Sequence, residues 1–139
     1  MTTRSVFVLL VLGGALLLIA IVIPIIDGTG DSALEIDAVR EIQVIQSAQD
    51  QYRSRYWRYA ATLAELGPPA NDLISKSLAS GEKNGYVFTL AATSQGYTIN
   101  ARPKVYNSTG RRSFNSDHTK RIHQNWSQEP ANASSPELR

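Results

Sequence analysis

Apolar side chains are distributed unevenly along the chain, and their spacing changes from one part to the next. Residues 6–26 form a continuous apolar run without a charged or strongly polar side chain. Residues 32–65 carry apolar side chains at every third or fourth position, the period of one helix face. Beyond residue 85 the period falls to two, which is typical of strands. The pattern predicts an α+β chain in which two helical segments precede a small antiparallel sheet of three to four strands.

The apolar run is predicted to span a membrane. At about 1.5 Å per residue a helix of this length reaches roughly 31 Å, close to the ~30 Å of a bilayer's hydrocarbon core. A cleaved secretory signal is the alternative, because Arg4 gives the start of the chain a positive charge. Such signals have apolar segments of only about 7–15 residues and then a small-residue cleavage site, which is missing here. The sequence therefore favours an uncleaved anchor.

The charges beside the run predict its orientation. Arg4 precedes it, whereas the charged residues that follow it are Asp27, Asp31, Glu35 and Asp37. Because positive residues stay on the cytoplasmic side, residues 1–5 are expected in the cytoplasm. Residues 27–123 then form an exported domain, which in a bacterium lies in the periplasm or outside the cell, and the inner membrane holds the single-pass helix.

Small residues and helix breakers give the run two further features. A patch of small side chains would let a second membrane helix approach closely, although Gly and Ala are common in such helices anyway. The patch consists of Gly13, Gly14, Ala15 and Ala20. A hinge is predicted after it, because Pro removes a backbone donor and Gly weakens a helix. The hinge residues are Pro24, Gly28 and Gly30.

An amphipathic helix is predicted over residues 32–65. Ser32 and Glu35 have the spacing of a capping box at its start, and the Gly-Pro-Pro sequence at residues 67–69 ends it. Residues 72–79 are expected to add one or two short helical turns.

The strands are predicted after this helical part. The β-rich runs 86–90 and 97–101 flank a Ser-Gln-Gly turn and indicate an antiparallel hairpin. Residues 112–115 and 121–124 are weaker strand candidates. The polar tail, residues 124–139, is either packed without regular structure or disordered.

Composition and charge narrow the class of protein. With 139 residues and 15.3 kDa, the chain has room for one small domain beside the anchor. It contains no cysteine, which excludes disulfide scaffolds, thiolate metal sites and cysteine nucleophiles. The net charge is only +2, but residues 86–139 hold seven Lys and Arg against three Asp and Glu. The distal half is therefore basic.

Two groups of side chains are candidates for binding. The basic residues of the distal half would suit an acidic partner, lipid headgroups or DNA, although they would equally form an ordinary solvated surface. They are Arg102, Lys104, Arg111, Arg112, Lys120 and Arg121. Aromatic and arginine residues alternate over 52–59 and could stack on nucleic acid. Helical spacing favours a simpler interpretation, in which the tyrosines cover the sheet and the arginines face water.

The sequence offers no sign of an enzyme or of a cofactor. Asp117, His118 and His123 are the only cluster with metal-ligand chemistry, and they lack a fourth ligand or a recognised spacing. No catalytic triad, phosphate loop or paired acid is supported by its surroundings. We therefore expect a protein without catalytic residues, cofactor, metal or small-molecule substrate.

Several motifs resemble bacterial type IV pilins and type II secretion pseudopilins. In order along the chain they are IAIVIP at 19–24, AVREIQVIQSAQDQY at 38–52, YAATLAELG at 59–67, LASGEKNGYVF at 78–88, ARP at 101–103 and TGRRSF at 109–114. The resemblance covers about residues 19–138. It implies one long helix, half in the membrane and half packed on a small antiparallel sheet.

Two features of that family are missing. Aligned on Pro24, the processing glycine of the family falls near Thr2, and its N-terminal glutamate falls at Phe7. In the family this glutamate is thought to neutralise the N-terminal amine of a neighbouring subunit. The resemblance thus implies a pilin-shaped chain, while these positions raise the alternative that it does not polymerise.

Two functions follow from these features. The first is a membrane-anchored structural subunit of a type IV pilus or type II secretion apparatus, with other membrane proteins and the lipid bilayer as its partners. The alternative is a non-polymerising accessory subunit of a large inner-membrane complex, respiratory or photosynthetic for example, with a periplasmic cap domain. A DNA-binding minor pilin is a weaker third hypothesis, and nucleic acid is not an expected partner.

Overall fold

The computed structural model describes residues 32–139, which belong to the second of two compact units, Met1–Gly30 and Asp31–Arg139. The predicted membrane helix over 6–26, its small-residue patch and the hinge lie outside the described residues. Those predictions concern Gly13, Gly14, Ala15, Ala20, Pro24, Gly28 and Gly30. Within residues 32–139, no helix combines the length and the apolar character that a membrane crossing requires.

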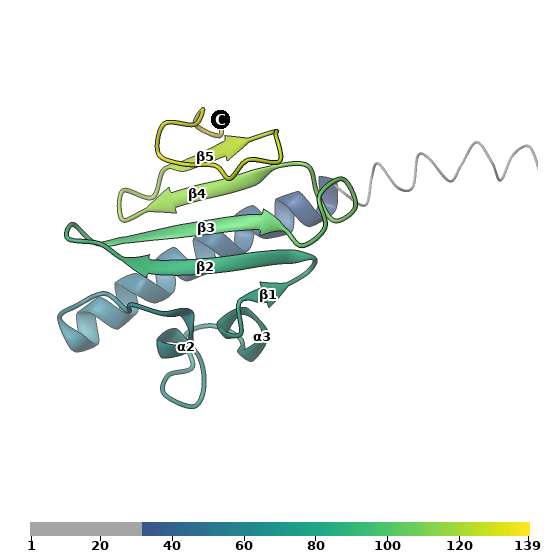
Figure 1. Ribbon diagram of the computed structural model, residues 1–139. Coiled ribbons are helices and arrows are strands. Elements are labelled where there is room, and N and C mark those ends of the chain that lie inside the picture. The colour runs from purple at the N-terminus through teal and green to yellow at the C-terminus, as the bar shows by residue number, and fades with distance from the viewer. Residues whose placement is uncertain (1–31) are drawn as a thin grey trace, which may run out of the picture. The chain divides into compact units, whose positions relative to one another are not determined.

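The described residues form one long helix on one face of an antiparallel sheet (Figure 1). The long helix covers residues 32–56. Its sheet-facing side chains are buried at intervals of three or four residues, as the sequence predicts: Ala38, Ile42, Ile45, Ala48 and Tyr52. The α+β class and the amphipathic helix are thus confirmed for this part of the chain.

The helix is shorter than predicted, because it ends at residue 56 and not at 65. Trp57 has a left-handed backbone conformation with φ of 58° and is 90% exposed. A separate short helix, α2 (Leu63–Leu66), then buries Leu63 and Leu66 in the same core. The apolar spacing therefore continues past residue 56 although the helix does not. This is why the spacing predicts a helix that is too long.

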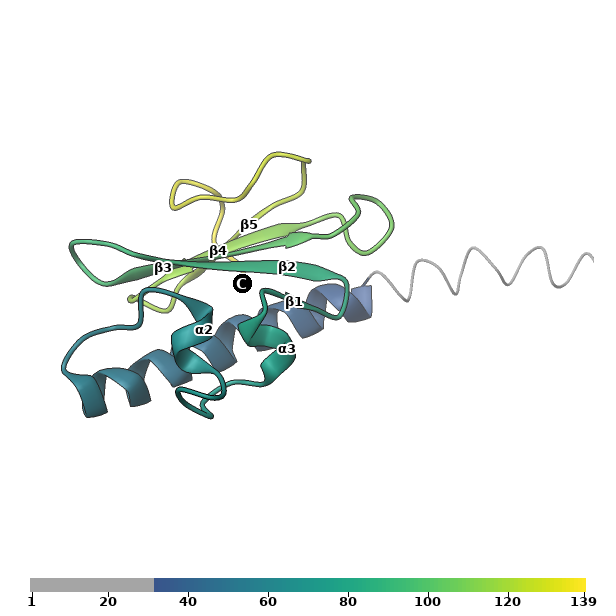
Figure 2. The ribbon, with the colours of Figure 1, turned by 60° about the horizontal axis from the view of Figure 1, so that its bottom comes forward.

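Two short helices lie beside the long one on the same side of the sheet (Figure 2). In α2 the Thr62 side chain accepts from the Glu65 N–H, and the Glu65 carboxylate accepts from the Thr62 N–H. This capping box stabilises a helix of only four residues. Helix α3 (Lys76–Ala79) has Ser75 as its N-cap and buries Leu78. It lies within the predicted helical turns at residues 72–79.

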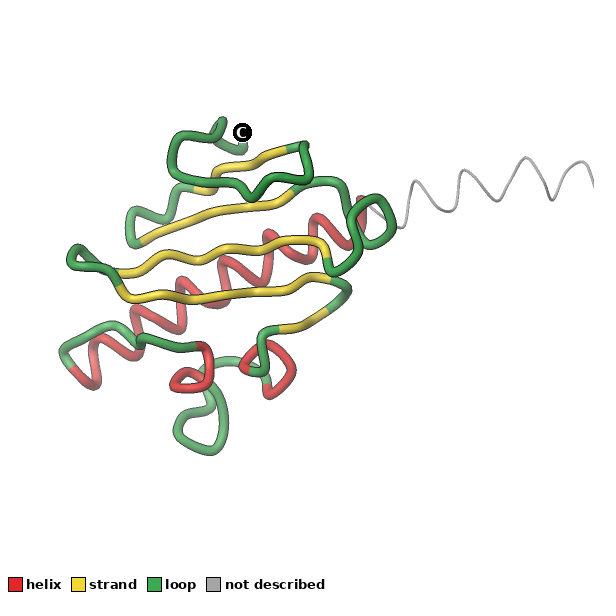
Figure 3. Tube along the Cα trace, viewed as in Figure 1, coloured by secondary structure: helices red, strands yellow, loops and turns green. Residues whose placement is uncertain are grey.

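The sheet has five strands in sequence order, each antiparallel to the next (Figure 3). Their bounds are β1 Glu82–Lys83, β2 Tyr86–Ala92, β3 Tyr97–Pro103, β4 Ser113–Asp117 and β5 Ile122–Asn125. The hairpin of β2 and β3 and the two weaker strands are confirmed. The prediction of three to four strands is wrong by one, because β1 has only two residues. The Asn84-Gly85 turn that joins β1 to β2 has positive φ at both residues, a known hairpin sequence.

The strand register separates an apolar face from a polar one. Leu90 pairs with Ile99, which pairs in turn with Ser116, and all three belong to the face against the helix. The opposite face carries Asn100 and Asn115, which pair across β3 and β4 and share a side-chain hydrogen bond of 2.9 Å. The core is therefore a single layer between the long helix and the sheet.

Buried polar side chains bind the long helix to the sheet and to the segment that follows the helix. Near the start, Glu35 binds the segment that leads into β4. Farther along, Gln46 donates to the Ser116 hydroxyl at 2.8 Å. Gln49 is fully buried and bonds to both the N–H and the C=O of Ala60, at 2.8 and 3.0 Å. A shift of the helix would break these bonds inside the core, where a lost partner is costly.

The C-terminal tail is packed and not disordered. The Gln124 N–H donates to the Pro136 C=O, and the Leu138 N–H donates to the Ile122 C=O, so the last residues run beside β5. Ala131 is buried, and its N–H donates to the Ser113 hydroxyl at 2.7 Å. One loop of the tail rises on the side of the sheet away from the helix (Figure 2).

The double bond between Gln49 and Ala60 gives the first testable prediction. Gln49→Ala leaves a buried backbone N–H and C=O without partners, so the free energy of unfolding should fall by about 2–4 kcal/mol. Gln51→Ala, an exposed position on the same helix, should change it by less than about 0.5 kcal/mol. Denaturant unfolding of the full chain in mild detergent measures both values. Equal losses in the two variants would contradict this role of Gln49.

Candidate functional site

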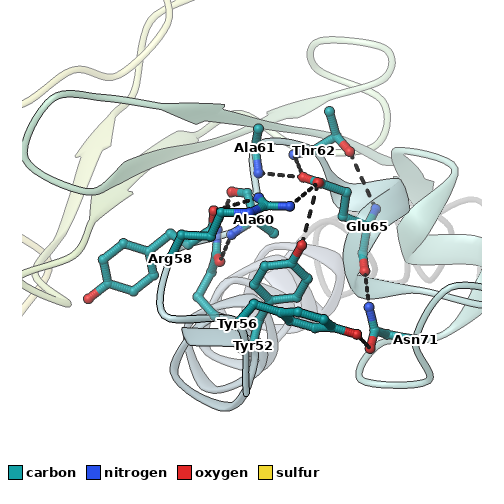
Figure 4. Close-up of polar contacts among 10 residues, drawn as sticks. Tyr52, Tyr56, Arg58, Ala60, Ala61, Thr62, Glu65 and Asn71 are labelled. Atoms are coloured by element: carbon teal, nitrogen blue, oxygen red, sulfur yellow. Dashed lines mark hydrogen bonds and ion pairs between the residues drawn. The ribbon is translucent and has the colours of Figure 1, made fainter. Parts of the chain in front are cut away.

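Aromatic and arginine residues of 52–59 lie at the end of the long helix, and Figure 4 shows three of them, Tyr52, Tyr56 and Arg58, beside Glu65. Their cations contact other residues of the domain. Arg53 donates to the Tyr59 hydroxyl at 2.8 Å, and Arg58 donates to the Glu65 carboxylate at 3.2 Å. Arg55 donates to Asn71, which also accepts from the hydroxyl of Tyr56. Through these bonds the arginines hold the segment that follows the helix in place.

Glu65 is the centre of this cluster. Its carboxylate accepts from the N–H groups of Ala61 and Thr62 at 2.6 and 3.1 Å and from Arg58. Burial alone raises the pKa of Glu65, but these hydrogen bonds and the charge of Arg58 outweigh it, so the pKa lies below its ordinary value. The ionised carboxylate thus binds α2 to the segment of residues 58–62.

The opposite end of the domain is organised by the buried ion pair of Glu35 and Arg112. One carboxylate oxygen of Glu35 accepts from the N–H groups of Arg111 and Arg112, at 2.9 and 3.2 Å. The other oxygen accepts from Arg112 Nε at 2.8 Å. The guanidinium of Arg112 also donates to Gln124 and lies 4.5 Å from the ring centre of Trp126. Arg112 is thus a packed residue of this end of the domain.

The six basic residues predicted as a partner surface separate into two groups. Arg102, Lys104, Arg111 and Arg112 lie at the end of the sheet where Glu35 lies, in or beside the connection between β3 and β4. Lys120 and Arg121 lie at the other end of β4, in the turn to β5. Lys120 forms an ion pair with Asp50, and Lys104 forms one with Glu82.

Two pockets adjoin the first group. One, of about 380 Å³, lies between the β3–β4 connection and the tail, and its lining includes Arg102, Lys104, Tyr106, Ser113, Ser127 and Pro130. The other, of about 330 Å³, lies between the start of the long helix and the C-terminus, and its lining includes Glu35, Ile36, Val39, Arg112 and Leu138. Both pockets combine apolar and charged side chains.

Glycine is required where the connection between β3 and β4 meets the sheet. The hydroxyl of Tyr86 lies against Gly110, where a β-carbon would clash with it. The same hydroxyl donates to the C=O of Arg112 at 2.8 Å. This close approach fixes the connection relative to the sheet and so positions the basic residues within it.

Asp117, His118 and His123 do not assemble into a metal centre. Among residues 32–139, no group of three or more metal-ligating side chains is close enough to hold an ion. Burial alone raises the pKa of Asp117, but hydrogen bonds from the Thr119 hydroxyl and N–H, together with both histidines, lower it below its ordinary value. A ring nitrogen of His123 bonds to the C=O of Ser135 at 2.7 Å. These residues therefore stabilise the turn and the tail.

Sequence analysis missed the contribution of Glu35 and Trp126 to this end of the domain. Glu35 has the local pattern of a helix cap, and its contact with Arg112 joins residues 77 positions apart. Trp126 stands in a polar segment whose packing has no periodic signal. Neither contact is visible without the fold.

Comparisons with protein-family models, with curated proteins and with solved structures find no match to this chain.

The lowered pKa of Glu65 predicts how stability depends on pH. A carboxyl whose pKa is lower in the folded protein stabilises it fully above the ordinary value of 4.5, and this contribution is lost as pH falls through the folded pKa. Glu65→Gln keeps an acceptor oxygen but cannot ionise. Its free energy of unfolding should therefore fall less steeply than that of the wild type below pH 4.5.

Glu129→Gln is the matched control, because Glu129 is an exposed carboxylate of the tail. It should follow the wild-type curve. Denaturant unfolding at a series of pH values measures the difference. Parallel curves for the wild type and Glu65→Gln would contradict the assignment.

Proposed function

We propose that the chain is a membrane-anchored, pilin-like structural subunit of a type IV pilus or type II secretion apparatus. The observation that carries the proposal is the order of its parts: an apolar run at residues 6–26 precedes an α+β head built on one long helix. The six pilin-like motifs agree with this order. In this proposal the chain acts by helix packing and protein–protein assembly.

The water-facing side of the long helix supports packing against other subunits. Val44 is 38% exposed there. Among the exposed positions of this helix, Gln43, Ser47 and Gln51 are polar but uncharged, whereas Arg40 and Asp50 are charged. Covering neutral side chains with another surface costs less free energy than covering charged ones. This side of the helix therefore suits assembly better than a strongly charged one.

The alternative is an accessory subunit of a large inner-membrane complex that does not polymerise. Thr2 and Phe7 favour it, because they occupy the positions of the processing glycine and the N-terminal glutamate. In this alternative the same anchor and head would cap the periplasmic side of a complex.

Fractionation of cells that make the native chain tests the proposal and separates it from the alternative. We expect the protein in the inner-membrane fraction, in sheared filaments or with secretion components. Intact-mass analysis then shows whether its N-terminus has been processed. Recovery with a respiratory or photosynthetic complex would favour the accessory subunit, and recovery from the soluble fraction would contradict both.

Val44→Glu tests the exposed face of the helix. A charge at this position should reduce co-purification of partners about tenfold, because burying an unpaired charge is costly, while the domain still folds. Gln95→Glu, at an exposed position of the turn between β2 and β3, is the control for added charge. Equal effects of the two substitutions would contradict a packing role for this face.

A further inference from the structure

Three large hydrophobic side chains are exposed at the end of the domain where the described chain begins. Ile36 is 56% exposed, Val105 is 53% exposed and Trp126 is 59% exposed. They come from the long helix, from the connection between β3 and β4, and from the residues after β5. Exposed apolar side chains from three elements at one end of a domain make that end a candidate contact surface.

Contacts between the elements place these side chains at one end. Glu35, the neighbour of Ile36, binds Arg111 and Arg112 at the entrance to β4. The hydroxyl of Tyr106, the neighbour of Val105, donates to the Trp126 C=O at 3.3 Å. Figure 1 shows the β3–β4 connection beside the start of the long helix.

Cationic side chains accompany the apolar ones. Arg40, Lys104 and Arg112 each form an ion pair with a carboxylate of the same region. Arg102 and Arg111 are exposed at this end. We define the basal surface as Ile36, Arg102, Lys104, Val105, Arg111 and Trp126.

The chemistry of the basal surface fits a bilayer surface. Trp has a large apolar ring and a polar N–H, and it is enriched where hydrocarbon meets water. Arg and Lys near a membrane are attracted to anionic headgroups. Ile36 and Val105 add apolar area without a further charge. A protein partner would equally cover apolar side chains. The bilayer is favoured because this surface lies at the end of the domain where residue 32 connects to the proposed anchor.

Chain length limits how far residue 32 can lie from the proposed anchor. Residues 27–31 separate the apolar run from residue 32 and reach at most about 18 Å when fully extended. Trp57 follows the other end of the long helix, 25 residues later, which corresponds to about 38 Å along a helix. The two tryptophans of the chain therefore report on opposite ends of the domain.

We propose that the basal surface docks on the membrane and binds anionic lipid headgroups, with the Trp126 ring at the level of the headgroups. This inference rests on the proposed membrane anchor. The docked head would have a defined orientation, with Trp57 and the arginines around it directed away from the bilayer.

Fluorescence quenching tests the proposal on the full chain in vesicles of phosphatidylglycerol and phosphatidylcholine with brominated acyl chains. Trp57→Phe leaves Trp126 as the only tryptophan, and Trp126→Phe leaves Trp57. We expect about twofold quenching of Trp126 by the brominated lipid and none of Trp57. Absence of Trp126 quenching, or equal quenching of both residues, would overturn the docking.

A second variant tests the lipid charge. In the Trp57→Phe background, the double substitution Arg102→Glu with Arg111→Glu should reduce the quenching of Trp126. Vesicles of phosphatidylcholine alone should reduce it as well. If neither change has an effect, the proposed binding of anionic headgroups is wrong. Circular dichroism confirms that each variant is folded.

Flotation of the same vesicles separates this inference from the proposed function. A chain that floats with the vesicles but shows no quenching of Trp126 retains its anchor and overturns only the docking. A chain that does not float overturns both. Quenching together with flotation supports both.

Discussion

The structure depends on the burial of one face of the long helix against one face of the sheet. Apolar contacts hold the two layers together but leave the position of the helix along the sheet loosely specified. Two buried polar side chains specify it, and a third fixes the turn that follows the helix. Glu35 binds the entrance to β4, Gln46 binds Ser116 in β4, and Gln49 binds Ala60. Each bond prevents the cost of an unpaired polar group in the core.

This constraint also arranges the two ends of the domain. At one end, the contact between Glu35 and the β3–β4 connection gathers cations and exposed apolar side chains. At the other end, the hold of Gln49 on Ala60 and the hydrogen bonds of Glu65 shape the turn after the helix. The domain thus presents one basic and apolar end near its connection to the N-terminal segment, and one aromatic end far from it.

Local sequence patterns predicted most of the fold, and their failures have physical causes. The amphipathic period identified the helix and the alternation identified β2 and β3. The apolar period also continues from Tyr59 to Leu66, but there the chain forms a turn and a separate helix. The side chain of Gln49 holds this turn, and no local sequence pattern indicates that contact. The Asn84-Gly85 pair could have revealed β1. The ion pair of Glu35 and Arg112 could not be predicted, because it joins distant residues.

The central claim is that the head is exported and held at a membrane by an anchor at its N-terminal side. Because the chain contains no cysteine, single cysteine substitutions can report its topology without interference. The direct measurement compares Lys76→Cys in the head with Ser5→Cys before the apolar run, using a maleimide that cannot cross membranes. The account predicts labelling of the first variant in intact spheroplasts and of the second only after lysis. Labelling of both variants only after lysis would contradict it.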